Sequence, residues 1–378
     1  MKKLGLYIHI PFCSSKCLYC DFPTLPYQEK RFDEYFCHLF KEIELFSENL
    51  DGYEIDTIYL GGGTPNYVPS KKIVELDGLL RSKFNISPVI EYTIEGNPEF
   101  INPEKYLTYL SCGINRISLG VQTFKDRLLK SIGRTHSGRE AYQKILLLQD
   151  LGFSNISLDF IMGLPNQKLD DVIFDMELID KLNIQHISYY DLIIEENTRF
   201  HYEYKKGNLN IPSESENREI YHKVITKLKE SGFFQYEISN FSKIGFKSKH
   251  NLKYWKNKEY LAFGLGAAGY FKGVRYNNTD NYKDYIKILD ENRLPIKNIE
   301  KLNELDKIFE KIIMNMRLVS GVSTKELLEE FGYDIYKKNG NLIKDYEKRG
   351  FLKINADSIA FTEKGFNISN KFFTDLLI

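Results

Sequence analysis

The sequence has few cysteines, no long hydrophobic run and no excess of charge of either sign. In 378 residues, Lys plus Arg and Asp plus Glu each number 52, so the net charge of zero gives no indication of a nucleic acid or an anionic membrane as partner. No apolar run approaches the roughly 18 residues that a membrane-spanning helix needs. The start, MKKLGLYIHIPFC, lacks the apolar stretch of a signal peptide. Hydrophobic residues still make up 42%, which predicts a globular protein with a large core.

The five cysteines are too few and too unevenly placed for a disulfide framework. Cys13, Cys17 and Cys20 lie within eight residues, whereas Cys37 and Cys112 each fall in an apolar helical pattern. We therefore expect a reducing compartment, most simply the cytoplasm, and we interpret Cys37 and Cys112 as small core residues.

Short β-rich runs alternate with helical patterns through the first half of the chain. Buried strands are predicted at 6–10, 56–62, 90–96, 115–122, 155–163 and 186–192. Apolar residues at three- and four-residue steps predict helices at 31–46, 70–82, 103–112, 139–152 and 170–182. Consecutive strand–helix units imply parallel strands, so the predicted fold class is α/β, with an open or closed barrel.

The residues that can carry chemistry follow these strands, where the active site of such a barrel lies. The cysteine group follows the first strand, GGGTP (61–65) ends the second, and Glu95, Gln122 and Asp159 end the next three. The glycines are expected to let backbone groups approach a ligand closely. Carboxylates, together with the cation Arg134, suit the amino, carboxylate and ribose groups of a cofactor.

After about residue 232 the alternation weakens, and a different organisation begins. We predict a core barrel at 1–232, a connecting segment that closes the barrel at 233–300, and a C-terminal domain at 301–378. A long helix at 305–319, two shorter ones and two strands within 351–362 indicate a winged-helix-like module. Within the core, the polar stretch 212–219 is interpreted as a loop.

Three closely spaced thiolates suit an iron–sulfur cluster better than zinc. A structural zinc site usually has four protein ligands, and the residue after Cys20 is Asp21 rather than another cysteine. A [4Fe–4S] cluster prefers thiolates and would keep one iron open here.

The spacing C-x3-C-x2-C resembles the signature of the radical S-adenosylmethionine (SAM) enzymes. The resemblance implies that Cys13, Cys17 and Cys20 bind a [4Fe–4S] cluster, that SAM binds the open iron, and that Tyr19 packs near the adenine. In that family one electron from the cluster cleaves SAM to a 5′-deoxyadenosyl radical.

Further motifs resemble one branch of this superfamily along nearly the whole chain. The oxygen-independent coproporphyrinogen III oxidase-like branch is similar at YIHIPFC (7–13), GGGTP, EGNP (95–98), GVQ (120–122), GRTH (133–136) and LDFIMGLP (158–165). The resemblance implies a partial (β/α)6 radical SAM barrel, the terminal domain of that branch and two bound SAM molecules. It assigns Tyr7, Gly62 and Glu95 to the first SAM, and Tyr19, Gly63, Thr64, Gln122, Arg134, Asp159 and Ile193 to the second position.

Two functions are compatible with this branch. One is an oxidase that decarboxylates propionates by a radical; the other is a haem chaperone that passes haem to acceptor haemoproteins, with membrane-associated respiratory proteins as candidates. Phe22 stands where the oxidases carry a fourth cysteine, and only 12 residues precede Cys13, whereas the oxidases have a longer N-terminal extension. HNLKYW (250–255) matches the H-N-x-x-Y-W motif of the chaperones. We therefore expect a haem chaperone, with the oxidase as the alternative.

HNLKYW has side chains with haem-binding chemistry. His250 offers an imidazole as an axial iron ligand, and Tyr254 and Trp255 offer rings that can stack on a flat macrocycle. The open alternative is a structural histidine with an aromatic pair that closes the barrel edge.

A third hypothesis comes from another class of protein. A winged-helix-like module could bind DNA and make the chain a cluster-based sensor, which requires a basic recognition helix. The candidate segments carry mixed charge, and Glu326, Glu329 and Glu330 would repel phosphates. We therefore expect no nucleic-acid partner.

Overall fold

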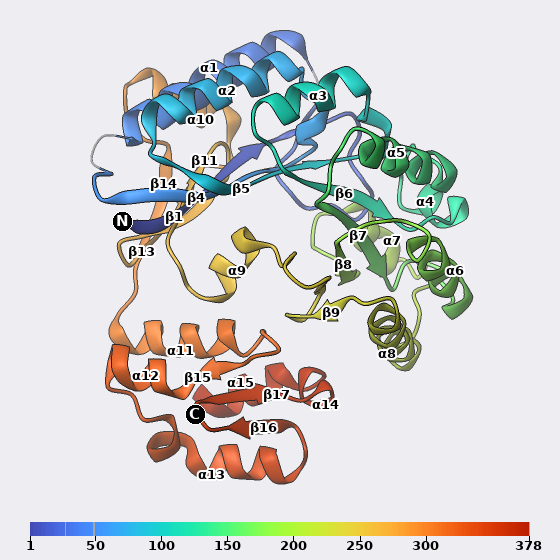
Figure 1. The fold of residues 1–378 in the computed structure, drawn as a ribbon, viewed down its shortest axis with the longest axis vertical. Coiled ribbons are helices and arrows are strands. Elements are labelled where there is room, and N and C mark those ends of the chain that lie inside the picture. Colours follow the sequence, from blue (N-terminus) through green and yellow to red (C-terminus); the bar gives the residue numbers. More distant parts are fainter. Residues whose placement is uncertain (27, 48–49, 378) are drawn as a thin grey trace.

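The computed structural model describes residues 1–26, 28–47 and 50–377 and contains an open, mostly parallel sheet beside a small C-terminal domain (Figure 1). Six parallel strands pair in chain order: β1 (Lys2–Ile10), β4 (Tyr53–Gly62), β5 (Ile86–Gly96), β6 (Arg116–Gln122), β7 (Ile156–Met162) and β8 (His186–Asp191). The α/β fold with a partial barrel is therefore confirmed.

Helices connect these strands and cover one side of the sheet, and two further helices, α7 (Arg199–Lys205) and α8 (Glu214–Glu230), follow the last strand (Figure 1). The connecting helices are α1 (Glu29–Phe46), α2 (Ser70–Lys83), α3 (Pro103–Ser111), α4 (Asp126–Ser131), α5 (Gly138–Asp150) and α6 (Leu169–Ile179). The loop predicted at 212–219 is wrong from residue 214 onward, because α8 begins there. Ser213 and Glu216 form a reciprocal capping box that satisfies the first backbone donors of the helix.

The segment 233–300, expected as a connector, supplies strands to both ends of the sheet. Beyond β1 lie β11 (Tyr260–Phe263), β12 (Ala268–Phe271), β13 (Val274–Asn278) and β14 (Ile296–Lys301), and beyond β8 lie β10 (Asn240–Ser242) and β9 (Phe234–Gln235). This segment also contains α9 (Lys249–Trp255) and α10 (Tyr282–Asp290). The resulting sheet has twelve strands in the part of the chain that the structure describes, and it does not close.

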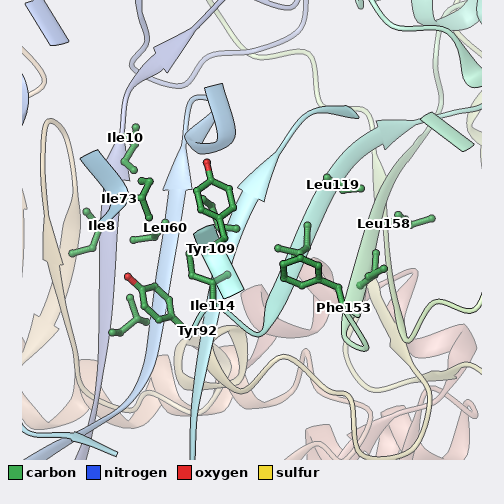
Figure 2. Close-up of a cluster of buried hydrophobic side chains, with 14 of the residues drawn as sticks. Ile8, Ile10, Leu60, Ile73, Tyr92, Tyr109, Ile114, Leu119, Phe153 and Leu158 are labelled. Atoms are coloured by element: carbon green, nitrogen blue, oxygen red, sulfur yellow. The ribbon is translucent and has the colours of Figure 1, made fainter. Parts of the chain in front are cut away.

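The two faces of the parallel strands differ in chemistry, because successive side chains point to opposite faces. Apolar side chains on the helix-covered face form the main core; Figure 2 shows part of it, including Ile8 and Ile10 of β1, Leu60 of β4, Leu119 of β6 and Leu158 of β7. The alternate positions are mostly polar and face the barrel interior: Tyr7, His9, Thr57, Tyr59, Glu91, Thr93, Glu95, Arg116, Ser118, Ser157, Asp159, His186, Ser188 and Tyr190. The barrel interior is therefore a polar surface built on an apolar layer.

The C-terminal domain has the predicted winged-helix-like order of elements. It contains α11 (Glu304–Asn315), β15 (Val322–Ser323), α12 (Thr324–Phe331), α13 (Ile335–Lys348), β16 (Leu352–Asn355), β17 (Ser358–Phe361), α14 (Glu363–Phe366) and α15 (Ser369–Leu377). Its own apolar core includes Ile312, Leu327 and Phe361. Two of the glutamates expected to repel phosphates, Glu326 and Glu330, pair with the buried Lys311 at 2.8 and 2.7 Å.

Helix α9 lies between the barrel and this domain (Figure 1). Asn315 of α11 donates a hydrogen bond of 2.8 Å to the carbonyl oxygen of Trp255 at the end of α9. Arg317 lies over the ring of Trp255, with 5.9 Å between the guanidinium carbon and the ring centroid. Among the described helices, none is long and apolar enough to cross a membrane.

Glu42 is a buried carboxyl that joins α1 to the segment after β11. It accepts hydrogen bonds from the Gly264 N–H at 2.9 Å, the Tyr285 hydroxyl at 2.6 Å and the Asn278 amide at 2.6 Å. Burial raises the pKa of Glu42 to about 7, although these three bonds act in the opposite direction.

This raised pKa predicts a pH-dependent stability. The folded state favours the protonated carboxyl, so its contribution is complete below about pH 4.5 and is lost as the pH rises through about 7. We expect Glu42→Gln to remove about 3 kcal/mol of the difference in unfolding free energy between pH 5 and pH 8. Denaturant titrations at both pH values measure this difference, and an equal difference in both proteins would contradict the prediction.

Candidate functional site

A cavity of about 430 Å³ lies at the carboxyl ends of the parallel strands. The loop after β1 supplies one wall, with Cys13, Cys17 and Cys20, and the ends of β4 to β8 supply the other. The structure therefore brings together motifs that are far apart in sequence, as the strand-end rule predicts.

The three cysteines are free, partly buried and directed into this cavity. Cys13 ends the short strand β2 (Phe12–Cys13), which pairs with β3 (Leu25–Pro26). Thr64 donates a hydrogen bond to the Cys13 sulfur at 3.5 Å. Burial raises the pKa of the Cys13 thiol, and this bond lowers it.

The two other cysteines lie away from the cavity. Cys112 is buried, as expected, but Cys37 is exposed on α1, so its interpretation as a core residue is wrong. Position 37 belongs to the outer side of α1, whereas Phe36 and Leu39 face the core. Sequence periodicity alone had placed this small apolar residue on the wrong side of the helix.

The arrangement of thiols fits a cluster better than a single metal ion. Within the described residues, no three His, Cys, Asp or Glu side chains converge as ligands of one ion. In a [4Fe–4S] cluster each thiolate binds a different iron, so its ligands surround the cluster and need no common point. Three thiols around one cavity satisfy that requirement.

The glycine motif packs against the cysteine loop. A Cβ atom on Gly62 would lie 2.6 Å from the His9 ring, and one on Gly63 would lie 2.7 Å from the carbonyl oxygen of Phe12. Gly62 also has a φ of 113°, which other residues rarely adopt. Both glycines line the cavity; contacts within the protein already favour glycine at these positions, and the close approach of a ligand to them stays a prediction.

Glu95 places a carboxyl in the cavity from the end of β5. It accepts hydrogen bonds from the Tyr59 hydroxyl at 2.7 Å and from the Gly62 N–H at 3.1 Å. Burial raises the pKa of Glu95 to about 7, while these two bonds favour the ionised form. The site thus holds a carboxyl that changes charge near neutral pH.

Further polar side chains line the cavity from β6, from β7 and from the segment after α4. Asp159 accepts a hydrogen bond from the Ser118 hydroxyl, at 3.2 Å to the nearer oxygen, and burial raises the pKa of Asp159. Arg134 donates to the Tyr19 hydroxyl at 3.3 Å, and the buried Nε atom of Arg134 has no hydrogen-bond partner within the described residues. Gln122 has a φ of 67° at the end of β6, a conformation that functional sites often hold.

Most residues expected to bind SAM therefore share one cavity. Its lining includes Tyr19, Gly62, Gly63, Thr64, Glu95, Gln122, Arg134, Asp159 and Ile193. Tyr7 lies behind this surface, where its hydroxyl bonds His9 at 3.0 Å and its ring stacks on Tyr59 at 6.2 Å. A direct contact between Tyr7 and SAM stays a prediction.

The HNLKYW side chains lie outside the cavity lining, although Asn251 reaches it. His250 is fully buried, and both of its ring nitrogens are bonded: Nδ1 to the Thr57 hydroxyl and Nε2 to the Tyr254 hydroxyl, each at 2.8 Å. The expected free imidazole is therefore not found. An axial bond from His250 to haem iron stays a prediction, and it would replace the bond to Thr57 or the bond to Tyr254. Tyr254 and Trp255 do not line this cavity, so their stacking on haem stays a prediction as well.

Several cavity residues were not predicted from the sequence. They are Ser15, Lys16, Thr24, Tyr59, Asn97, Ser118, Ser188, Tyr190, Asp191, Leu192, Glu195 and Asn251, among others. The signal for Tyr59, Ser118, Ser188 and Tyr190 is the alternation within each strand, which puts polar residues on the face opposite the apolar core.

Comparisons with known proteins agree with this geometry. Residues 7–179 match the family described as the Radical SAM superfamily, and residues 302–368 match the HemN C-terminal domain. A protein of Bacillus subtilis (strain 168) named "Heme chaperone HemW" is 35% identical over 368 residues, which are 97% of each chain. Its namesake from Lactococcus lactis is 35% identical over 381 residues, covering 100% of this chain and 98% of the relative.

A solved structure has the same fold. Coproporphyrinogen III oxidase (HemN) from Escherichia coli, described as a radical SAM enzyme, superposes with a TM-score of 0.87 and covers 99% of this chain and 90% of its own. The two sequences are 21% identical, so this likeness supports the fold alone.

Proposed function

This chain belongs to the HemW family of radical SAM proteins, and from that premise we propose that it is a haem chaperone, which binds haem and delivers it to acceptor haemoproteins. The main support for this proposal is the similarity to proteins named "Heme chaperone HemW". This similarity extends over the full length of the chain and includes both domains. The same proposal includes membrane-associated respiratory proteins as acceptors. It also includes a cytoplasmic location, with which the five free thiols are consistent.

The proposed cofactors are a [4Fe–4S] cluster and SAM. Cys13, Cys17 and Cys20 would hold the cluster, and Glu95, Asp159 and Arg134 offer groups of both charges to a zwitterionic ligand in the same cavity. When bound, the cluster supplies an open iron for the amino and carboxylate groups of SAM and an electron for its cleavage. The chain's own residues orient the ligand and set the charge of the site through Glu95.

The rim of the cavity has side chains that suit a flat apolar ligand such as haem. Phe22 and Ile193 both line the cavity, and their side chains are 58% and 66% exposed. Large apolar side chains that remain exposed beside a cavity favour contact with an apolar partner. Lys16, on the same rim, offers a cation to a haem propionate.

A haem titration beside an oxidase assay, on one anaerobic preparation, tests this function. We expect haem to bind saturably, with a shift of its Soret band, and coproporphyrinogen III to remain unconsumed in the presence of SAM and a reductant. Consumption of coproporphyrinogen III without saturable haem binding would instead support the oxidase.

A further inference from the structure

His250 occupies the space behind the cavity and contacts a residue of its wall. The imidazole stacks on the ring of Tyr59, with 5.1 Å between ring centroids and 29° between ring planes. Its bonds to Thr57 and Tyr254 fix the imidazole from both sides. Burial lowers the pKa of His250 to about 3, so the ring is neutral and one nitrogen donates while the other accepts.

The backbone around His250 is also fixed. The N–H groups of Lys249 and His250, at the start of α9, both donate to the carboxylate of Glu91 at 2.9 Å. Ser248 caps the helix by accepting a hydrogen bond from the Asn251 N–H at 3.3 Å. Lys253 pairs with Asp56 at 2.6 Å. The imidazole therefore has one position relative to β4 and β5.

Tyr59 connects His250 to the cavity, because its ring packs on the imidazole and its hydroxyl bonds Glu95. One side of its ring meets His250, the Tyr7 ring lies within stacking distance at 6.2 Å, and its hydroxyl donates to Glu95. A ring held in this way cannot turn away from Glu95 without losing its packing. A hydrogen bond to a carboxylate is worth more than a neutral one, and it favours the ionised form.

We propose that His250 is a positioning residue, which holds the Tyr59 ring so that its hydroxyl keeps Glu95 oriented as an acceptor for the amino group of SAM. This inference rests on the proposed function, because it requires SAM in the cavity. It gives the histidine of HNLKYW a role in the SAM site that does not need contact with haem iron.

Charged and titratable groups surround Glu95 from every neighbouring element, and each affects its ionisation. They are Tyr7 of β1, Tyr59 of β4, Arg116 of β6, Asp159 of β7, Tyr190 of β8 and Tyr254 of α9. Asp159 raises the pKa of Glu95, whereas Arg116 and the bond from Tyr59 lower it. Loss of the Tyr59 bond therefore shifts the ionisation of Glu95 to higher pH.

The matched control is His186, a second buried histidine with the same bonding pattern. Its Nδ1 atom bonds the Ser157 hydroxyl and its Nε2 atom bonds the Tyr236 hydroxyl, each at 2.8 Å. Neither Ser157 nor Tyr236 is part of the cavity lining described above. Loss of either imidazole removes two hydrogen bonds to hydroxyl groups, although the Tyr236 hydroxyl still accepts a bond from the Ser248 N–H at 3.3 Å, so the two alanine variants are similar in their structural cost.

The experiment measures SAM binding by the full-length protein, reconstituted with its cluster, in equilibrium dialysis from about pH 6 to about pH 8.5. We expect His250→Ala to raise the Kd of SAM about tenfold at pH 7 and to move the pH at which binding is half-lost upward. His250→Phe, which keeps a ring on Tyr59, should restore most of the affinity. His186→Ala should leave both the Kd and the pH profile unchanged.

A double variant separates positioning from a general loss of structure. In a Glu95→Gln background, His250→Ala should weaken SAM binding no further, because its effect passes through Glu95. Equal shifts in His250→Ala and His186→Ala, or an unchanged profile in His250→Ala, would overturn the positioning role alone. A wild-type protein that binds its cluster but not SAM would overturn the proposed SAM site as well.

Discussion

Replacement of Cys17 by Ala is expected to remove the iron–sulfur cluster almost completely. The loop after β1 offers three thiols to the cavity, and a [4Fe–4S] cluster with an open iron needs all three. Cys37 is exposed on α1 and Cys112 is buried beside α3, and neither lines the cavity. Neither can therefore replace the lost ligand. Iron content in anaerobically reconstituted protein should fall from about four atoms per chain to nearly none, with loss of the broad visible absorbance.

Cys37→Ala is the matched control for this prediction. It removes one thiol from the same chain at an exposed position, where no core contact is lost. We expect it to keep about four irons and the full absorbance of the wild-type protein. A complete cluster in Cys17→Ala would show that another residue is the third ligand.

Replacement of Glu95 by Gln should weaken SAM binding by about 10- to 100-fold at pH 8, because it removes the carboxylate that would accept hydrogen bonds from the amino group of SAM. The pKa of Glu95 is raised to about 7. Wild-type affinity should therefore increase as the pH rises through 7, because the ionised carboxyl is the stronger acceptor for the N–H groups of the ligand. Glu95→Gln should remove this increase and bind SAM weakly at every pH. Equilibrium dialysis with SAM over this pH range measures both effects.

Glu237 provides the control for the charge of Glu95. It is a fully buried glutamate, and burial raises its pKa to about 7, as it does for Glu95. Its carboxylate accepts a hydrogen bond from the Ser239 N–H at 3.2 Å, and Glu237 is not part of the cavity lining. Glu237→Gln should therefore leave the pH dependence of SAM binding in place. A flattened profile in Glu237→Gln, or an unchanged one in Glu95→Gln, would contradict the assignment.

Local sequence patterns predicted the parts of this protein that depend on local physics. The strand predicted at 115–122 is β6, Arg116–Gln122, and the helix predicted at 70–82 is α2, Ser70–Lys83. Both follow from apolar periodicity. The gathering of Cys13, Glu95 and Asp159 in one cavity followed from a general property of parallel strands.

Features that depend on distant contacts could not be predicted in the same way. The need for glycine at 62 comes from the His9 ring on another strand. The environment of His250 comes from Thr57 and Tyr59, nearly 200 residues away in the chain, and no pattern within HNLKYW indicates these partners. The start of α8 was missed for a different reason, because its first turn is polar and the capping residues Ser213 and Glu216 also suit a loop.

The order of strands in the sheet has a consequence for synthesis on the ribosome. β1 pairs on one side with β4 and on the other with β11, where Gly5 is opposite Tyr260 and Ile8 is opposite Phe263. Tyr35 links the ends of β1 and β11, because its hydroxyl donates to the carbonyl of His9 and accepts from the Leu265 N–H.

Until β11 has left the ribosome, β1 is therefore an edge strand, paired with β4 on one side and open to wrong partners on the other. Only then can the Leu265 N–H complete the hydrogen bonding of Tyr35, whose hydroxyl supports the base of the cysteine loop, so this part of the cluster pocket is finished after about two thirds of the chain has been made.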